Sequence, residues 1–290
     1  MIYFSSLLKH QFLELTIELE NGLTEQKIKF GYLSNTKDIW CRDYMPIPVE
    51  EEQYVLFRYH PSYLKGVPEI RTDNKLVCSE NGISYKYSSL IIDGGNVVRF
   101  GSKVILTDRV FLDNNVSIGN VKLINQLEKL LKAQLIIIPT EDDDVIGHAD
   151  GMVRFLNQNT ILVNDYSKTK TPKRFQKKLF SILEQNQLEI NLIPYFPDER
   201  WIQKNKYDVA PAFGVYINYL QVGETIFLPQ FNNQEQNHLA TEQFERLFKT
   251  IVKINCQELA LGGGLLNCIF WNTSYRNPLK TSKEIKQNPS

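Results

Sequence analysis

The sequence has neither the excess of positive charge typical of nucleic-acid-binding proteins nor the long apolar runs typical of membrane proteins. Basic and acidic residues number 33 each, so the formal net charge is zero and neither nucleic acid nor an anionic membrane is expected as a partner. No apolar run approaches the ~20 residues that span a bilayer, which argues against a transmembrane helix. Hydrophobic residues make up 42% and charged residues 23% of the chain, as is typical of globular proteins.

Cysteine and histidine are also scarce. The four cysteines (Cys41, Cys78, Cys256 and Cys268) form no CxxC pair and no regular framework, which favours free thiols and a reducing, cytoplasmic location. Residues 1–22 carry charges among their apolar residues, and no small-residue cleavage site follows, so we expect no signal peptide.

Motifs for metals and nucleotides are missing as well. The four histidines are dispersed, and neither GxGxxG before a helix nor GxxxxGK[ST] occurs. The acidic run Glu141–Asp144 is expected to be a solvated turn rather than a metal site. We therefore predict no metal and no cofactor.

What the sequence does contain is an internal repeat. DGGNVVRFGSKVILTDR (93–109) and DGMVRFLNQNTILVNDY (150–166) align by eye, and each is typical of a polar element followed by a β-hairpin. Weaker copies occur near residues 42, 216 and 267. The residues that open the copies recur about every 50 to 70 positions, as in arrayed supersecondary units: Asp43, Asp93, Asp150, Asn218 and Cys268.

Amphipathic helices are predicted between the hairpins, at 120–134, 171–187 and 237–253, each followed by an apolar, strand-like run. For the first, the expected buried stripe is Val121, Ile124, Leu127, Leu130 and Leu131. Thr171 is expected to cap the second helix, and the stripe of the third is expected to extend to Ile251.

The recurring unit is therefore strand, strand, helix, strand. Five such units closed around an axis would bury their inner strands and leave no open sheet edge. We predict an α/β fold, a five-bladed propeller of ββαβ units, as one domain over residues 1–280, with a polar tail at 281–290 that frays. The opening residues of all five copies would then face one centre.

Cys268 is the first candidate for chemistry because three glycines, Gly262–Gly264, precede it. Glycines permit close approach, so they could clear a pocket beside the sulfur. Alternatively, they form a tight turn into a buried strand with an inert thiol. His148 stands two residues before Asp150, and in extended backbone both side chains would project to one face and could address one substrate.

Two further carboxylates open copies of the repeat. Asp43 lies in a mixed apolar stretch beside Trp40 and needs a partner if it is buried; Arg42 could pair with it or with neighbouring backbone. Asp93 in DGGN could either line the common centre or only form a turn.

Four motifs together resemble the agmatine deiminase and bacterial peptidylarginine deiminase family: WCRDYMP (40–46), DGGN (93–96), GHADG (147–151) and GGGLLNC (262–268). The resemblance implies a five-bladed α/β propeller of the pentein superfamily, without metal or organic cofactor. It further implies that Cys268 is the nucleophile, that His148 is the general acid and base, and that Asp43 and Asp150 bind the guanidinium. Trp40, Asp93 and Asn218 are further candidates for substrate contacts.

The sequence departs from the family pattern at Met45, Gly151 and Asn267, which leaves the substrate's tail open. An amine tail would seek an acidic or aromatic wall, whereas an α-carboxylate would seek an arginine. The candidate arginines are Arg58, Arg71, Arg99 and Arg154, although the repeat positions of the last two also fit a structural role. Trp40 or Trp201 could pack against an alkyl chain or simply belong to the core.

These observations predict a cytoplasmic deiminase that converts a small guanidino compound, agmatine by default, to a ureido product and ammonia through a covalent thiouronium. The alternatives are a hydrolase or amidinotransferase of the same fold acting on arginine, methylarginine or peptidyl-arginine, or a binding protein without turnover. The expected partner is the small-molecule guanidino substrate, and a homo-oligomer is compatible with the sequence.

Overall fold

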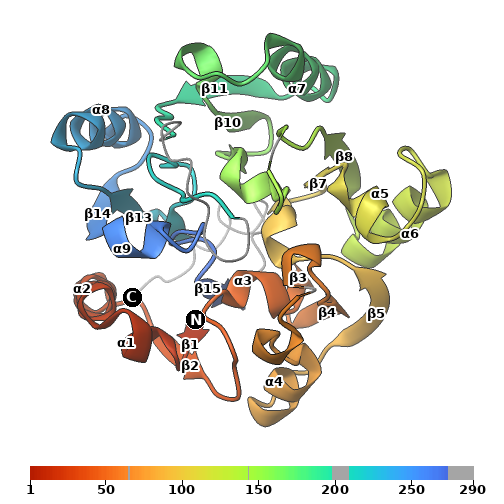
Figure 1. The fold of residues 1–290 in the computed structure, drawn as a ribbon, viewed down its shortest axis with the longest axis horizontal. Coiled ribbons are helices and arrows are strands. Elements are labelled where there is room, and N and C mark those ends of the chain that lie inside the picture. The colour runs from red at the N-terminus through yellow and green to blue at the C-terminus, as the bar shows by residue number, and fades with distance from the viewer. Residues whose placement is uncertain (65, 143, 198–208, 274–290) are drawn as a thin grey trace, which may run out of the picture.

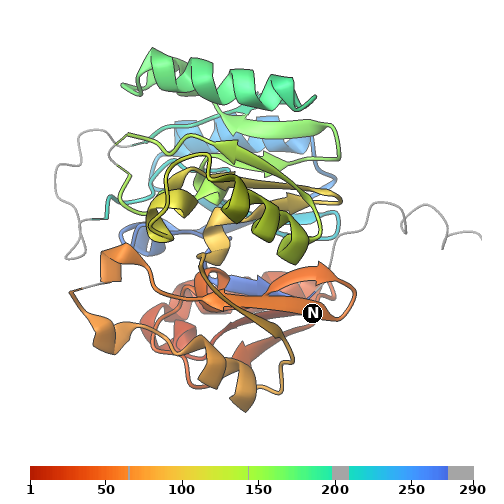
Figure 2. The same ribbon diagram turned by 90° about the vertical axis from the view of Figure 1, so that its right-hand side faces the viewer.

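The structure, a computed structural model, describes residues 1–64, 66–142, 144–197 and 209–273. In this part of the chain, five three-stranded sheets surround a central axis, and the helices lie on the outside (Figure 1). In the side view of Figure 2, the green helix at the top edge is α7, on the outer side of its sheet. The predicted five-bladed α/β propeller is confirmed.

Each sheet, or blade, has the same construction. Its middle strand pairs antiparallel with the inner strand and parallel with the outer strand, and a helix connects the middle strand to the outer one. Four blades follow one another along the chain. Their strands are β3 (Ile47–Glu50), β4 (Gln53–Arg58) and β5 (Lys86–Ile91); β6 (Val98–Phe100), β7 (Lys103–Thr107) and β8 (Gln134–Ile138); β9 (Val153–Phe155), β10 (Thr160–Asn164) and β11 (Glu189–Ile193); and β12 (Leu220–Val222), β13 (Thr225–Gln230) and β14 (Thr250–Asn255).

The fifth blade joins the two ends of the described chain. Its inner strand β15 (Phe270–Asn272) pairs with β1 (Ile2–Ser5), which pairs in parallel with β2 (Phe30–Leu33). The weak copy of the repeat near residue 267 is thus completed by the N-terminal segment, and this closure leaves no blade short of a strand.

The outer helices are α2 (Leu13–Glu25), α4 (Asn74–Glu80), α6 (Val121–Leu131), α7 (Lys173–Gln185) and α8 (Gln234–Glu245). Shorter helices connect the elements: α1 (Leu8–Gln11), α3 (Cys41–Tyr44), α5 (Arg109–Asp113), α9 (Gln257–Ala260) and the 3-10 helices η1 (Ser62–Leu64), η2 (Pro68–Ile70), η3 (Gly94–Asn96), η4 (Ala149–Gly151) and η5 (Tyr166–Lys168). No helix of the described residues is long and apolar enough to cross a membrane.

The buried face of α6 matches the predicted stripe at Leu127 and Leu131 and differs from it at Val121 and Leu123. Leu123, Leu127 and Leu131 are buried, whereas Val121 is 65% exposed. The helix begins after Asn120, whose side chain accepts a hydrogen bond from the Leu123 amide, and this cap places Val121 in the first turn on the solvent side.

The other two predicted helices differ at their ends. Pro172 rather than Thr171 precedes the first residue of α7, and no side chain caps that end. The helix α8 ends at Glu245, and Ile251 lies in β14. The predicted tail 281–290 and Trp201 lie outside the described residues.

Candidate active site

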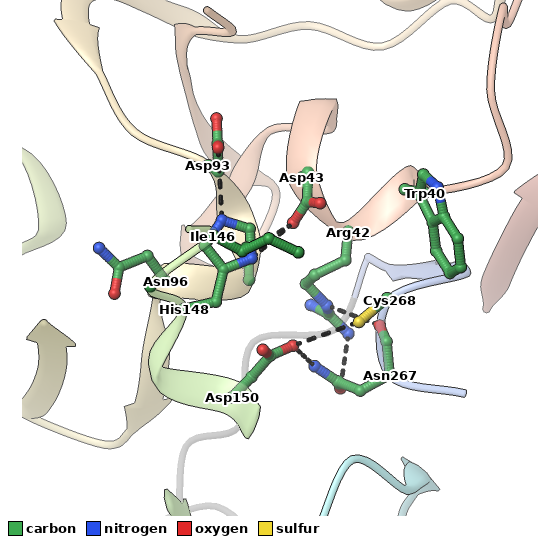
Figure 3. A network of polar contacts seen from close by, with 12 residues as sticks. Trp40, Arg42, Asp43, Asp93, Asn96, Ile146, His148, Asp150, Asn267 and Cys268 are labelled. Carbon is green, nitrogen blue, oxygen red and sulfur yellow. Dashed lines mark hydrogen bonds and ion pairs between the residues drawn. The ribbon is translucent and has the colours of Figure 1, made fainter. Parts of the chain in front are cut away.

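The residues that open the five copies of the repeat all lie at the axis, just before the inner strands. Asp43 lies in α3, Asp93 precedes η3, and Asp150 lies in η4 directly after His148. Asn218 precedes β12, and Cys268 precedes β15. Figure 3 shows Asp43, Asp93, His148, Asp150 and Cys268 gathered there from segments that are far apart in the sequence.

His148 lies between two carboxylates. Its Nδ1 is 3.6 Å from Asp43 Oδ1, and its Nε2 is 3.3 Å from Asp93 Oδ2. The Gly95 amide donates to the same Asp43 oxygen over 3.0 Å. An alanine Cβ at Gly95 would lie 2.5 Å from the His148 Nδ1, so glycine is needed for this close approach.

Burial and neighbouring charges shift the pKa values of His148 and Asp43. Burial lowers the pKa of His148, but Asp43, Asp93 and Asp150 outweigh burial and raise it above its usual value. Burial raises the pKa of Asp43, and His148 opposes that rise. With His148 holding the shared proton, the site contains an imidazolium at neutral pH, able to act as a general acid.

The thiol of Cys268 lies among acceptors. Its Sγ is 3.4 Å from Asn218 Oδ1 and 3.9 Å from Asp150 Oδ2. Burial raises the pKa of this thiol well above its usual value, and Asp150 and Asp43 raise it further. The free site therefore holds a neutral thiol, not a resting thiolate.

Asn267 joins the segment of Cys268 to Asp150. Its Nδ2 donates to Asp150 Oδ2 over 2.6 Å, and its Oδ1 accepts from Arg42 Nη2 over 3.3 Å. The Arg42 side chain thus pairs with Asn267, including its carbonyl oxygen at 3.2 Å, rather than with Asp43. The chain Arg42, Asn267, Asp150 fixes the carboxylate beside the sulfur.

These side chains line one cavity of about 610 Å3. Of the predicted site residues, those that line it are Trp40, Asp43, His148, Asp150, Asn218 and Cys268. Asp93 is not among the lining residues. Its carboxylate contacts the His148 ring at 3.3 Å, and it makes no cap bond in its turn, so it can hold the imidazole in place.

The three glycines before Cys268 lie in the wall of the cavity. A Cβ at Gly262 or Gly264 would lie 2.8 or 2.6 Å from the Trp40 indole, and Gly263 has a φ of +85°. The glycines therefore make room for Trp40, which forms part of the cavity wall, and allow the left-handed turn that leads to Cys268.

The cavity wall is acidic and aromatic. Its acidic members are Asp38, Asp43, Glu141, Asp142, Asp144 and Asp150, and its aromatic members are Phe12, Trp40, Tyr59, Tyr63 and Tyr195. Lys37 is the only lysine or arginine among the described lining residues. The acidic run at 141–144, expected to be a solvated turn, thus contributes to the wall; Asp143 lies outside the described residues.

The candidate arginines lie elsewhere. Arg71 contacts the His60 ring through its Nη1 at 2.5 Å, and Arg99 and Arg154 line a second cavity. Arg58 is an exposed residue at the end of β4 and is not in the lining either. No group of three histidine, cysteine or acidic side chains in the described part of the chain is arranged to hold a metal ion.

Sequence reasoning missed several contributors to the site. Asp38 accepts from the Trp40 amide over 2.8 Å and from Thr72 over 2.7 Å, and burial raises its pKa to about 6. Its position two residues before Trp40 fits an Asx-type turn, the one local signal that could have marked it. Tyr59 and Tyr63 carried no such signal, because their loop only meets the site in the folded chain.

A five-bladed α/β ring of this construction is the pentein fold. The chain belongs to the Porphyromonas-type peptidyl-arginine deiminase family, whose model matches residues 11–273.

Individual relatives are distant in sequence but close in fold. A protein assigned as an agmatine deiminase in Streptococcus mutans is 22% identical over 221 residues, which cover 67% of this chain and 59% of that protein. The C. jejuni agmatine deiminase structure aligns with a TM-score of 0.71 at 16% identity, covering 93% of this chain and 92% of that one. A form of it with one cysteine replaced by serine and substrate bound aligns with a TM-score of 0.69 at 15% identity and the same coverage.

Proposed function

We propose that this chain is a cysteine-dependent deiminase that hydrolyses the guanidinium group of a small guanidino compound to a ureido product and ammonia. The supporting observation is that Cys268, His148, Asp43 and Asp150 line the same cavity. Membership of a family of guanidino-group hydrolases agrees with this chemistry. A pure binding protein would have no use for a thiol and an imidazolium in one cavity.

The two carboxylates suit the planar cation. A guanidinium is protonated at neutral pH and presents a fork of N–H donors, so Asp43 and Asp150 can each accept from it. Asp150 lies 3.9 Å from the Cys268 sulfur, so a guanidinium held on Asp150 brings its central carbon toward that sulfur. Holding reactants in such an orientation accounts for much of an enzyme's rate enhancement.

Substrate binding also activates the nucleophile. The pKa of Cys268 is raised by burial and by Asp150 and Asp43. A bound cation neutralises the effect of both carboxylates and favours the thiolate, whose proton is released to solvent. The enzyme thus generates its nucleophile only when the guanidinium is present.

Two half-reactions then share His148. The thiolate attacks the guanidinium carbon, the C–N bond breaks, and the imidazolium protonates the departing ammonia, which leaves a thiouronium on Cys268. Neutral His148 next takes a proton from water as the oxygen bonds to the same carbon. The C–S bond breaks as the added oxygen gives up its remaining proton to solvent, and the ureido product leaves with the thiolate and the imidazolium restored.

We infer that the substrate carries a cationic tail, with agmatine as the default. Four acidic side chains besides Asp43 and Asp150 line the cavity, and its described wall has no arginine to pair with an α-carboxylate. An amine is attracted by such a wall and a carboxylate is repelled. Trp40 and Tyr59 supply apolar surface for an alkyl chain.

The test is a panel of agmatine, arginine, methylarginine and a peptide with an arginyl end, scored for ureido product and ammonia without an added amine acceptor. Agmatine should give the highest kcat/KM. Cys268→Ala should abolish product while a thermal shift with agmatine persists, and Cys78→Ala, which removes a buried thiol away from the cavity, is the matched control. Full activity of Cys268→Ala would reject the mechanism, and a preference for arginine would reject the cationic tail.

A further inference from the structure

A second cavity lies farther along the inner strands than the catalytic one. Its volume is about 140 Å3, which on the same measure holds several waters, since one water needs about 10–15 Å3. All five inner strands contribute to its lining: Ile47 and Pro48 of β3, Val98 and Arg99 of β6, Arg154 and Phe155 of β9, Gln221 of β12, and Phe270, Trp271 and Asn272 of β15. It therefore lies on the propeller axis.

The charge in this cavity is one-sided. Arg42, Arg99 and Arg154 line it, and Asp150 is the only acidic residue among its described lining. That carboxylate already accepts from Asn267 over 2.6 Å and faces the sulfur of Cys268. Three guanidinium groups thus line a space whose described lining contains one carboxylate, and that carboxylate is committed to the catalytic side.

The three arginines differ in how they are held. Arg99 donates to the carbonyl oxygens of Val49 and Leu131, and Arg42 donates to Asn267. The Arg154 guanidinium stacks on the Tyr219 ring, with its Cζ 4.6 Å from the centroid, and the side chain makes no hydrogen bond or ion pair with another described residue. Its fork of N–H donors is therefore available, and stacking fixes its plane.

The proximity of Arg154 also affects Arg42. Burial, and after it the charge of Arg154, lower the pKa of Arg42 to about 10. Arg42 therefore stays charged at neutral pH, and its repulsion by the Arg154 guanidinium is an unfavourable interaction in the folded chain. An anion between them would remove it.

We propose that this axial cavity binds a small oxyanion, with Arg154 as the principal ligand and Arg42 and Arg99 beside it. A phosphate or a short carboxylate fits both the volume and the bidentate geometry of a guanidinium. Asp150 lines both cavities, but none of the three arginines lines the catalytic one. The oxyanion and the guanidino substrate therefore bind at the same time.

Calorimetric titration with inorganic phosphate, and separately with acetate, tests this at constant ionic strength set by chloride. Saturable binding of either is expected, and the tighter one identifies the type of oxyanion. Arg154→Met should weaken it at least about tenfold, as expected when a charged hydrogen-bonding partner is removed. Arg154→Lys keeps the charge but loses the planar fork of N–H donors, so its affinity for the anion should fall between those of the parent and Arg154→Met.

Arg246→Met is the control, because Arg246 is exposed at the end of α8. The affinity of this variant for the anion should equal that of the parent within about twofold. Melting curves in chloride verify that each variant is folded. Saturating agmatine added to the Cys268→Ala variant should leave the oxyanion affinity within about threefold. The proposal is overturned if neither anion binds saturably, if Arg154→Met and Arg154→Lys bind as the parent does, or if agmatine displaces the anion. None of these readouts depends on turnover, so they are independent of the proposed deiminase activity.

Discussion

Gly95→Ala is the smallest change that should separate catalysis from folding. The added Cβ would lie 2.5 Å from His148 Nδ1 and 2.7 Å from Asp43 Oδ1. Ordinary contact begins near 3.4 Å, so the imidazole and the carboxylate must each move by roughly 0.7–0.9 Å, since overlap of packed atoms is relieved by displacement. A misplacement of about 1 Å costs on the order of 100-fold in rate, or about 2.7 kcal/mol of barrier.

The expected result is therefore a fall of about 100-fold in kcat/KM for ureido product, with a stability loss of about 1–3 kcal/mol that leaves the protein folded. Gly66→Ala is the matched control, because a Cβ there meets nothing within 4 Å and its φ is not positive; it should be as active as the parent. Folding is checked by thermal melts followed by circular dichroism. If Gly95→Ala keeps activity within about threefold of the parent while folded, His148 and Asp43 do not need the observed geometry, and the reasoning is refuted.

Three further predictions concern single side chains. Because Asp93 raises the pKa of His148, Asp93→Asn should lower the pH at which the His148 ring titrates by NMR; an unchanged midpoint contradicts that coupling. Asn267→Ala removes a bond to the Asp150 carboxylate and should raise KM about tenfold or more, more than it lowers kcat; a parental KM contradicts the role of Asn267 in holding Asp150. Leu127→Ala should cost about 2–5 kcal/mol in denaturant unfolding and Val121→Ala little, whereas equal losses contradict the observed face of α6.

The fold could be predicted from the sequence wherever the repeat was well preserved. The copies opening at Asp93 and Asp150 carry the same Val-Arg-Phe strand and hairpin, and they became the blades containing β6 and β9. The fifth blade was harder to foresee. Its inner strand β15 pairs with β1 from the other end of the described chain, and no local pattern records which distant strand completes a sheet.

The faces of the helices were less predictable than their presence. In α6, Val121 and Leu123 both fit an apolar stripe, and the cap at Asn120 decides between them. The surface of the domain tolerates an exposed valine, so composition alone does not place the stripe.

The candidate site shows the same division between local and distant information. Cys268, His148 and Asp150 were predicted because each opens or adjoins a copy of the repeat. The reason for a glycine at position 264 could not be predicted, because the indole ring that it accommodates belongs to Trp40, near the other end of the chain. The acidic wall likewise combines Asp38 with Glu141 from separate loops, and only the fold brings them together.

The central claim is that Cys268 becomes covalently bonded to the guanidinium carbon during turnover. The most direct measurement is an acid quench of the working enzyme on agmatine, followed by peptide mass mapping. We predict a peptide containing Cys268 whose mass is increased by that of the substrate less one ammonia, and no such adduct at Cys41, Cys78 or Cys256. An active enzyme without an adduct at Cys268, or with the adduct at another cysteine, would contradict the account.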